Sequence, residues 1–181
     1  MDIVLGSTWE VGPDFRKNAT RIFETNVSTP FNLHFTKVNL ERGGWEEMEL
    51  FNPEMGYERV VYFNPNVAIL KNIDWLLEYD GTLLGTENIE VTNPEISKKS
   101  MPYYRSEFTT PVMAFDGEAL AGIWHIYKQN INFFHQFDNC GEAIDMLIRG
   151  KDRDLIQQLY PGKLISHYED ATDETSLVIG G

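Results

Sequence analysis

Few residues in this chain are of a type and spacing suited to acid–base or anion-binding chemistry. Glu142 opens a helix-like segment, where it is a candidate general acid or base or simply a solvated residue favoured by the helix dipole. Lys98, Lys99 and Arg105 form a basic cluster in a long polar segment, either to bind phosphate or as part of a solvated loop. The histidines show no metal-ligand spacing, and no phosphate-loop, dinucleotide-binding or zinc motif occurs. The meaning of these candidates therefore depends on the fold that positions them.

Composition excludes several classes of protein. Fifteen Lys and Arg against 28 Asp and Glu give a net charge of −13, which disfavours nonspecific binding to nucleic acid or to an anionic membrane surface. The apolar runs are too short to span a bilayer, and the N-terminus lacks a signal-peptide pattern. The single cysteine, Cys140, excludes an intramolecular disulfide and favours a buried thiol. We expect a cytoplasmic protein with no nucleic-acid partner and no membrane insertion, and the oligomeric state stays open.

The order of apolar patterns predicts an α/β fold. At 181 residues and 42% apolar composition, the chain is expected to form one domain over 1–181. Strand-like runs alternate with helix-like segments, which favours a mixed, mostly parallel sheet flanked by helices. The expected strands are 2–5, 31–38, 59–63, 82–85, 108–115, 163–166 and 177–179, and the expected helices are 12–27, 45–51, 72–77, 116–127, 140–149 and 152–160.

Two of the expected helices carry a clear apolar face. The spacing of apolar residues indicates buried faces made by Phe15, Ala19, Ile22 and Phe23 in the first helix and by Leu120, Ile123, Trp124 and Tyr127 in a later one. Asn72 is of the capping type that begins a helix, and Asp116-Gly117-Glu118 starts the later one. The strand 59–63 is rich in β-branched and aromatic residues, which is typical of a central strand.

The segment 57–77 resembles the heart of a GT-A glycosyltransferase. It is similar to the glycogenin-like family eight and its small bacterial and phage relatives, which carry a strand, an Asp-x-Asp motif, a short strand and a helix in this order. Segments 44–51, 108–115 and 161–166 resemble further pieces of that family in the expected sequence. The resemblance implies a single GT-A-like, Rossmann-like domain that binds a nucleotide sugar.

The resemblance also exposes a departure at the metal site. In the family, two aspartates hold a divalent cation that neutralises the diphosphate of the donor. Here Asn64 and Asn66 occupy those positions and flank Pro65, so two negative charges are missing. We therefore expect no cofactor, with Mn²⁺ or Mg²⁺ present only if the degenerate motif still binds one. The two asparagines are either weakened ligand contacts or turn residues retained after the chemistry was lost.

Other positions implied by the resemblance also differ from the family. Glu47 stands where a lysine is common, and Thr109-Thr110 replaces an Asn-Ser pair that would contact the substrate. Glu142-Ala143 is the best match to an Asp-Gln pair, with Asp138-Asn139 as the alternative alignment. Trp9 follows the first strand, where such folds seat the nucleotide base, although packing would equally explain it.

Three functional hypotheses follow. The chain is a transferase that works without the standard metal site, or a nucleotide-sugar binding protein whose metal-dependent sugar transfer is weakened or lost. Alternatively, it is a non-catalytic structural or assembly protein, of phage origin, that uses only the fold. Since fold does not determine function, the site has to decide among them.

Overall fold

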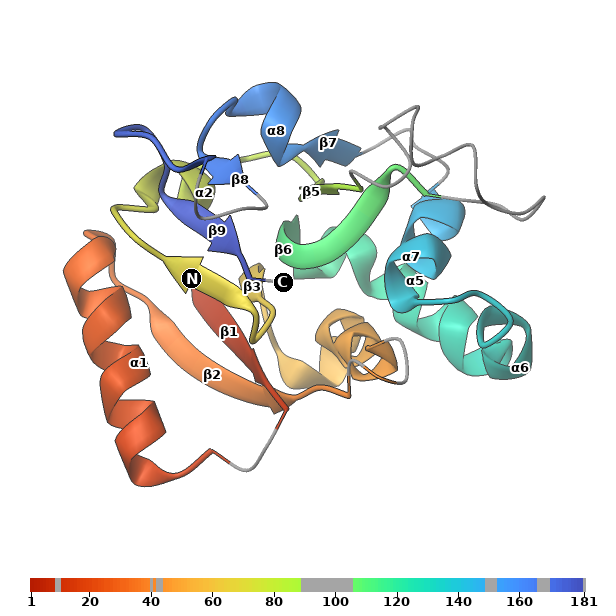
Figure 1. The fold of residues 1–181 in the computed structure, drawn as a ribbon. Coiled ribbons are helices and arrows are strands. Elements are labelled where there is room, and N and C mark those ends of the chain that lie inside the picture. Colours follow the sequence, from red (N-terminus) through yellow and green to blue (C-terminus); the bar gives the residue numbers. More distant parts are fainter. Residues whose placement is uncertain are drawn as a thin grey trace.

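The centre of the molecule is a six-stranded sheet with the strand order β2-β1-β3-β6-β5-β7 (Figure 1). The computed structural model describes residues 1–8, 11–39, 41, 44–88, 106–148, 153–165 and 170–180. Neighbouring strands are parallel except at β6, which runs antiparallel to both β3 and β5. The predicted α/β fold with a mixed, mostly parallel sheet is confirmed. The strands are β1 (Asp2–Ser7), β2 (Asn32–Lys37), β3 (Arg59–Phe63), β5 (Leu83–Glu87), β6 (Phe108–Asp116) and β7 (Arg153–Leu155).

Strand β3 lies between β1 and β6, as its composition predicts. Successive side chains of a strand point to opposite faces, so β3 contributes to two cores. Val60 and Tyr62 pack into one hydrophobic core, and Val61 and Phe63 into the other. All four are 0% exposed. A continuous apolar run is what a strand covered on both faces requires.

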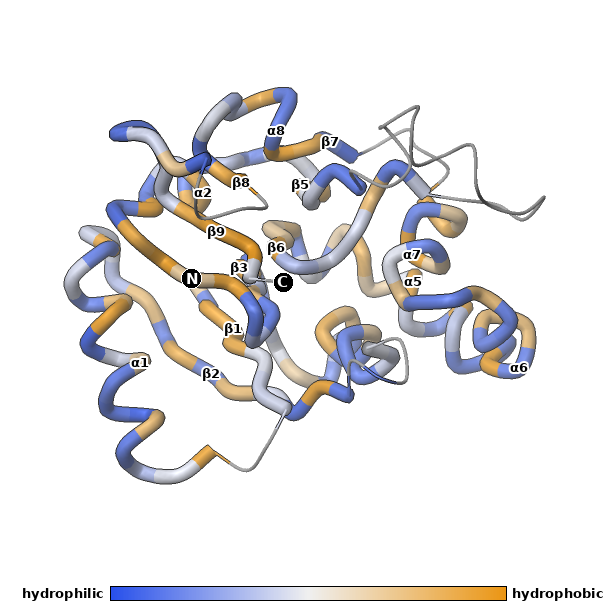
Figure 2. The backbone as a smooth tube through the Cα atoms, in the orientation of Figure 1, coloured by the Kyte–Doolittle hydropathy of each residue, from blue (hydrophilic) through white to orange (hydrophobic). Residues whose placement is uncertain are grey.

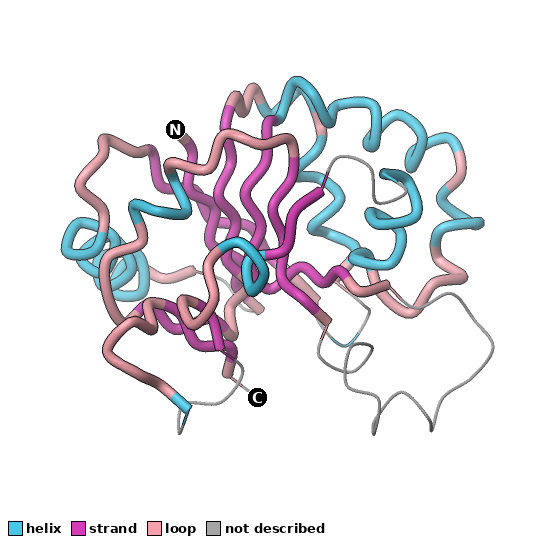
Figure 3. Tube along the Cα trace, turned by 90° about the horizontal axis from the view of Figure 1, so that it is seen from above, coloured by secondary structure: helices cyan, strands magenta, loops and turns pink. Residues whose placement is uncertain are grey.

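Helices cover both faces of this sheet (Figure 3). One core contains side chains from the 3-10 helix η2 and from α5, α6 and α7, and the other contains side chains from α1, α2 and α8. The central strands carry mainly apolar residues, as the hydropathy colouring shows (Figure 2). The helices are α1 (Pro13–Asn26), η2 (Trp45–Phe51), η3 (Pro53–Met55), α2 (Asp74–Leu77), α5 (Gly117–Gln129), α6 (Ile131–Phe134), α7 (Cys140–Ile148) and α8 (Ile156–Leu159).

A second sheet of three short strands brings the C-terminal part of the chain to the end of β3. Its order is β4-β9-β8, with β9 (Leu177–Ile179) antiparallel to β4 (Val67–Ile69) and parallel to β8 (Leu164–Ile165). Beyond β9, the backbone N–H of Gly180 donates to the carbonyl of Asn66 at 2.7 Å. Residues far apart in sequence therefore meet at the turn that follows β3.

Side-chain hydrogen bonds lie at the starts of α5 and α2, although the N-cap of α2 is Ile73 and the expected Asn72 lies one residue before it. The Asp116 carboxylate accepts a hydrogen bond from the backbone N–H of Ala119 at 2.8 Å, and Asn72 accepts one from Asp74 at 3.0 Å. These bonds satisfy backbone donors that the first turn leaves unpaired. The predicted buried face of α5 is confirmed at Leu120, Ile123 and Tyr127, whereas Trp124 is only partly buried.

Three local predictions were wrong. The segment 152–160 is not one helix, because β7 pairs in parallel with β5 before the single turn of α8 begins. Strand β1 continues through Ser7 rather than ending at Leu5, since β2 offers it paired partners to that point. Ile22 is 44% exposed although its spacing places it beside Phe23, because α1 turns only Ala19 and Phe23 fully toward the sheet.

Candidate functional site

The turn after β3 lies at the carboxyl end of the parallel strands, where open α/β sheets bind their ligands. The backbone N–H of Asn64 donates to the carbonyl of Pro111 at 2.8 Å, which fixes the start of the turn against β6. The Asn64 side-chain oxygen accepts from the backbone N–H of Asn66 at 3.1 Å. This is the local bond by which asparagine stabilises turns. It holds Asn64 and Asn66 side by side at the strand end.

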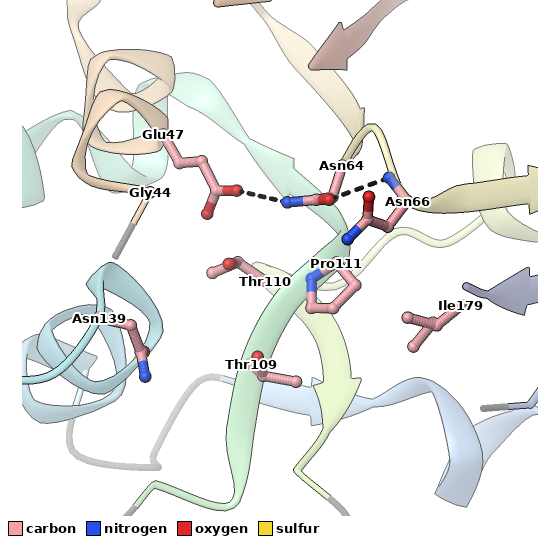
Figure 4. A pocket seen from close by; sticks show the side chains of 9 residues that line it. All are labelled: Gly44, Glu47, Asn64, Asn66, Thr109, Thr110, Pro111, Asn139 and Ile179. Carbon is pink, nitrogen blue, oxygen red and sulfur yellow. Dashed lines mark hydrogen bonds between the residues drawn. The ribbon is translucent and has the colours of Figure 1, made fainter. Parts of the chain in front are cut away.

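A polar cavity of about 230 Å³ opens beside this turn. Figure 4 shows side chains from η2, the β3 turn, β6 and the segment before α7 around it. Amides and hydroxyls supply most of its polar atoms. The lining residues are Gly44, Glu47, Asn64, Asn66, Thr109, Thr110, Pro111, Asn139 and Ile179.

The carboxyl group of Glu47 is the centre of a buried hydrogen-bond cluster at this cavity. Its Oε1 accepts from the hydroxyl of Tyr62 at 2.8 Å and from the amide nitrogen of Asn64 at 3.2 Å, and Figure 4 shows the second of these bonds. Its Oε2 accepts from the thiol of Cys140 at 2.9 Å. Thr110 also contributes a side-chain hydrogen bond to it. Glu47 is 1% exposed, so this acidic group sits among neutral donors rather than in water.

Two glycines make room for this cluster. Gly44 caps η2 with φ of +66°, a left-handed conformation that L side chains rarely adopt. A Cβ on Gly6 would lie 2.7 Å from the Tyr62 hydroxyl and 2.9 Å from Pro65 Cδ. Because Gly6 has no side chain, the Tyr62 hydroxyl that bonds to Glu47 and the ring of Pro65 in the turn can both pack against β1.

Burial shifts the acid–base behaviour of this cluster. Desolvation raises the pKa of Glu47 above its ordinary value, because the surrounding hydrogen bonds lower it by less. Desolvation also raises the pKa values of Tyr62 and Cys140, and the nearby Glu47 raises them further. Tyr62 and Cys140 therefore stay neutral donors at ordinary pH. A perturbed carboxyl group in a polar cavity marks a candidate functional site.

Comparison with solved structures identifies the fold. The galactosyltransferase LgtC, solved in complex with donor and acceptor sugar analogs, matches with a TM-score of 0.64 and 12% identity over 99% of this chain and 87% of LgtC. A glycosyltransferase involved in the glycosylation of the major capsid of PBCV-1 matches with a TM-score of 0.56 and 11% identity, over 98% of this chain and 92% of that one. The chain has a GT-A-like glycosyltransferase fold. No protein-family model and no curated protein sequence matches it.

Four of the residues predicted from the sequence meet at the cavity of this GT-A-like fold. Asn64 and Asn66 come from the turn after β3, and Thr109 and Thr110 from β6. The remaining candidates, Trp9, Lys98, Lys99 and Arg105, lie outside the described residues.

Glu142 is placed differently from the other candidates. It lies in the first turn of α7, 7% exposed, and is not among the described residues that line the cavity. Its carboxylate accepts from the backbone N–H of Asp138 at 3.2 Å, and its own N–H donates to the Asn139 side chain at 3.0 Å. The cavity is lined instead by Asn139, the position given by the alternative alignment. Glu142 therefore stabilises the first turn of α7 through hydrogen bonds with the segment that precedes it.

Glu47 is the site residue that sequence reasoning missed. Its one signal was its position in the tryptophan-containing segment, where a lysine is common in the resembled family. Nothing local in the sequence indicated that it is buried. Its partners Tyr62 and Asn64 lie 15 and 17 residues away, and Cys140 lies 93 residues away.

Within the described lining, the donor set of the cavity does not suit a divalent cation. The Asn64 oxygen is engaged by the Asn66 N–H, and its nitrogen points toward Glu47. Within the described ranges, no three His, Cys, Asp or Glu side chains gather as a metal cluster. A hard divalent ion favours several anionic oxygens, and Glu47 is the one ionisable residue in the described lining.

The same turn also borders a second, mainly apolar cavity of about 290 Å³. Pro65 forms part of its wall, together with side chains of β1, α1 and β4 such as Leu5, Phe15 and Ala68. The Asn64–Asn66 turn therefore contributes to the walls of both a polar cavity and an apolar one.

Among the described residues, no helix is long and apolar enough to cross a membrane.

Proposed function

We propose that this chain binds a nucleotide sugar across the Asn64–Asn66 turn and that metal-dependent sugar transfer is weakened or lost. The observation that carries the proposal is the pair of cavities bordering this turn at the carboxyl end of β3. The fold is that of glycosyltransferases, and LgtC was solved with donor and acceptor sugar analogs. A flat, weakly polar base suits the apolar cavity, and a ring bearing hydroxyls suits the amides and hydroxyls of the polar one.

The proposal includes a donor held without a divalent cation. Asn64 and Asn66 supply neutral amides in place of the acidic ligands that Mn²⁺ or Mg²⁺ requires. The charge of the diphosphate then has to be offset by basic side chains, and the sequence offers Lys98, Lys99 and Arg105. We place the protein in the cytoplasm, and its relation to glycogenin-like and phage proteins is part of the same proposal.

A thermal-shift series tests the binding. Nucleotides and nucleotide sugars are added to the chain with and without Mn²⁺, since a ligand that binds the folded state raises the melting temperature by mass action. We expect a nucleotide sugar to raise it equally in both conditions. Ala68→Trp, which fills the apolar cavity, is expected to remove the shift. Ala171→Trp makes the same change at an exposed alanine and serves as the control.

Product assays separate binding from turnover. Donor hydrolysis and transfer to simple acceptors are expected to be far slower than in a metal-dependent transferase. Rapid metal-dependent turnover would contradict the proposal. Failure of every donor to bind would favour the structural or assembly protein instead.

A further inference from the structure

Glu47 differs from the other residues of the polar cavity in being ionisable. The lining otherwise consists of amides, hydroxyls, Gly44, Pro111 and Ile179, and the described part of it holds no lysine, arginine or histidine. The described hydrogen-bond partners of the Glu47 carboxyl are all neutral donors: Tyr62, Asn64, Thr110 and Cys140. An acidic group thus faces the cavity with no described cation to offset it.

Gly44 lies against this carboxyl group, and both residues line the cavity. A Cβ on Gly44 would lie 3.4 Å from both Cδ and Oε1 of Glu47 and 3.6 Å from Oε2. Any larger side chain at this position would cover the carboxyl group. With glycine there, Glu47 both holds the cluster together and contributes to the cavity wall.

The charge of a ligand group entering this cavity therefore matters. A hydroxyl can donate to the carboxyl oxygens or accept from the neighbouring amides, so a neutral sugar satisfies the lining. An ammonium group would supply the missing positive charge. A ligand carboxylate would stand against Glu47 in a region of low dielectric, where like charges repel strongly once Glu47 is ionised.

We propose that Glu47 is the specificity-determining residue of this cavity and that it selects donors whose sugar is neutral or carries an amine over donors whose sugar is a uronic acid. This inference rests on the proposed function, because it assumes that the polar cavity takes the sugar ring. It adds the class of sugar and the side chain that chooses it.

Three matched donors test the selection. UDP-glucose, UDP-glucosamine and UDP-glucuronic acid share one nucleotide and differ in the charge of the sugar. The ratios of their dissociation constants therefore isolate the effect of that charge on binding. By calorimetry at a pH high enough to ionise Glu47, the wild-type chain is expected to bind the glucuronic acid donor about tenfold more weakly than the other two, or weaker still. Equal affinity for the three would overturn the inference and leave the proposed function intact.

Two variants assign the selection to Glu47. Glu47→Gln keeps the shape and removes the charge, and it should bring the three affinities within about twofold of one another. Glu49→Gln removes the same charge from an exposed position of η2 and should leave the ratio unchanged. An unchanged ratio in Glu47→Gln would overturn the inference.

A further variant covers the case in which Glu47→Gln does not fold. Asn139→Asp adds a second acidic group to the cavity wall and retains the oxygen that accepts from the Glu142 N–H. It should increase the discrimination against the glucuronic acid donor, and a decrease would count against the inference.

If no donor binds, the proposed function fails and the inference is tested alone. The methyl glycosides of the same three sugars are then compared by saturation-transfer NMR. Binding of the neutral and amino glycosides but not of the glucuronide would support the role of Glu47. Absence of binding by all three, or lack of this preference, would overturn it.

Discussion

The thiol of Cys140 donates to a carboxyl oxygen of Glu47 at 2.9 Å, although 93 residues separate the two in sequence. The bond joins the start of α7 to η2 beneath the polar cavity. Glu47 is 1% exposed and so is Cys140, so neither group has water as an alternative partner. Leaving a buried acceptor without its donor costs about 1–3 kcal/mol, which makes this contact part of what shapes the cavity.

Cys140 should be unreactive in the folded protein. Burial, and next the charge of Glu47, raises the pKa of the thiol well above its ordinary value, and the thiolate is the reactive form. We expect a disulfide reagent or iodoacetamide to label the native chain very slowly and the urea-unfolded chain rapidly. Labelling followed by mass spectrometry measures both rates. Fast modification of the native chain would show that the thiol is accessible and that the cluster opens readily.

Much of the fold could be predicted from local patterns. The run 59–63 is apolar without alternation, which is typical of a strand covered on both faces, and it became the central β3. Asp116 precedes a helical pattern and became a cap. The segment 153–155 is too short for a periodicity to show, and it became a strand because β5 presents an edge to pair with.

The site was predictable only in part. Asn64 and Asn66 follow a predicted strand end, and Thr109 and Thr110 begin the neighbouring strand, so topology alone brings them together. Glu47 could not be predicted as buried, because a glutamate in a polar segment is usually solvated. Its burial depends on Tyr62, Asn64 and Cys140, which only the tertiary structure places around it.

Glu47→Gln should change how stability depends on pH. The raised pKa of Glu47 means that, above its ordinary value of 4.5, the folded chain holds a proton that the unfolded chain has lost. The contribution of Glu47 to the free energy of unfolding is therefore full below pH 4.5 and is lost as the pH rises through the raised pKa. Urea unfolding at several pH values from about 4.5 upward should show the wild type losing stability relative to Glu47→Gln.

The control for that measurement is Glu49→Gln, which removes an exposed glutamate from the same helix η2. Its difference from the wild type should stay nearly constant across the same range. A wild type that gains stability relative to Glu47→Gln as the pH rises would show that Glu47 is stabilised as the carboxylate.

The basic cluster predicted from the sequence should act on the phosphates of a donor. Replacing Lys98, Lys99 and Arg105 together by alanine is expected to abolish nucleotide-sugar binding, because the described lining of the polar cavity offers no cation. Binding of an uncharged methyl glycoside should be unaffected. Calorimetry with both ligands measures the two effects, and unchanged donor affinity would mean that the diphosphate is held elsewhere.

Placing aspartate at positions 64 and 66 should create metal dependence. The wild type is expected to show no micromolar Mn²⁺ or Mg²⁺ site, and a calorimetric site removed by Asn66→Ala would contradict this. The Asn64 nitrogen lies 3.2 Å from Glu47 Oε1, so a carboxylate at position 64 would oppose a second acid. In EDTA the double variant Asn64→Asp/Asn66→Asp should therefore melt below the wild type.

Mn²⁺ should reverse this order of melting temperatures if the rest of the cavity can hold a metal ion. A cation bound between the new carboxylates offsets their repulsion and stabilises the folded state by mass action, so the melting temperature of the double variant should rise with Mn²⁺ while that of the wild type does not. Adding Glu47→Gln to the double variant removes the opposing acid and should raise its melting temperature in EDTA. Metal-dependent donor binding by the double variant would mean that the cavity can hold a donor and lacks only the two charges. Metal binding without donor binding would favour the structural or assembly protein, because the rest of the site must then have diverged as well.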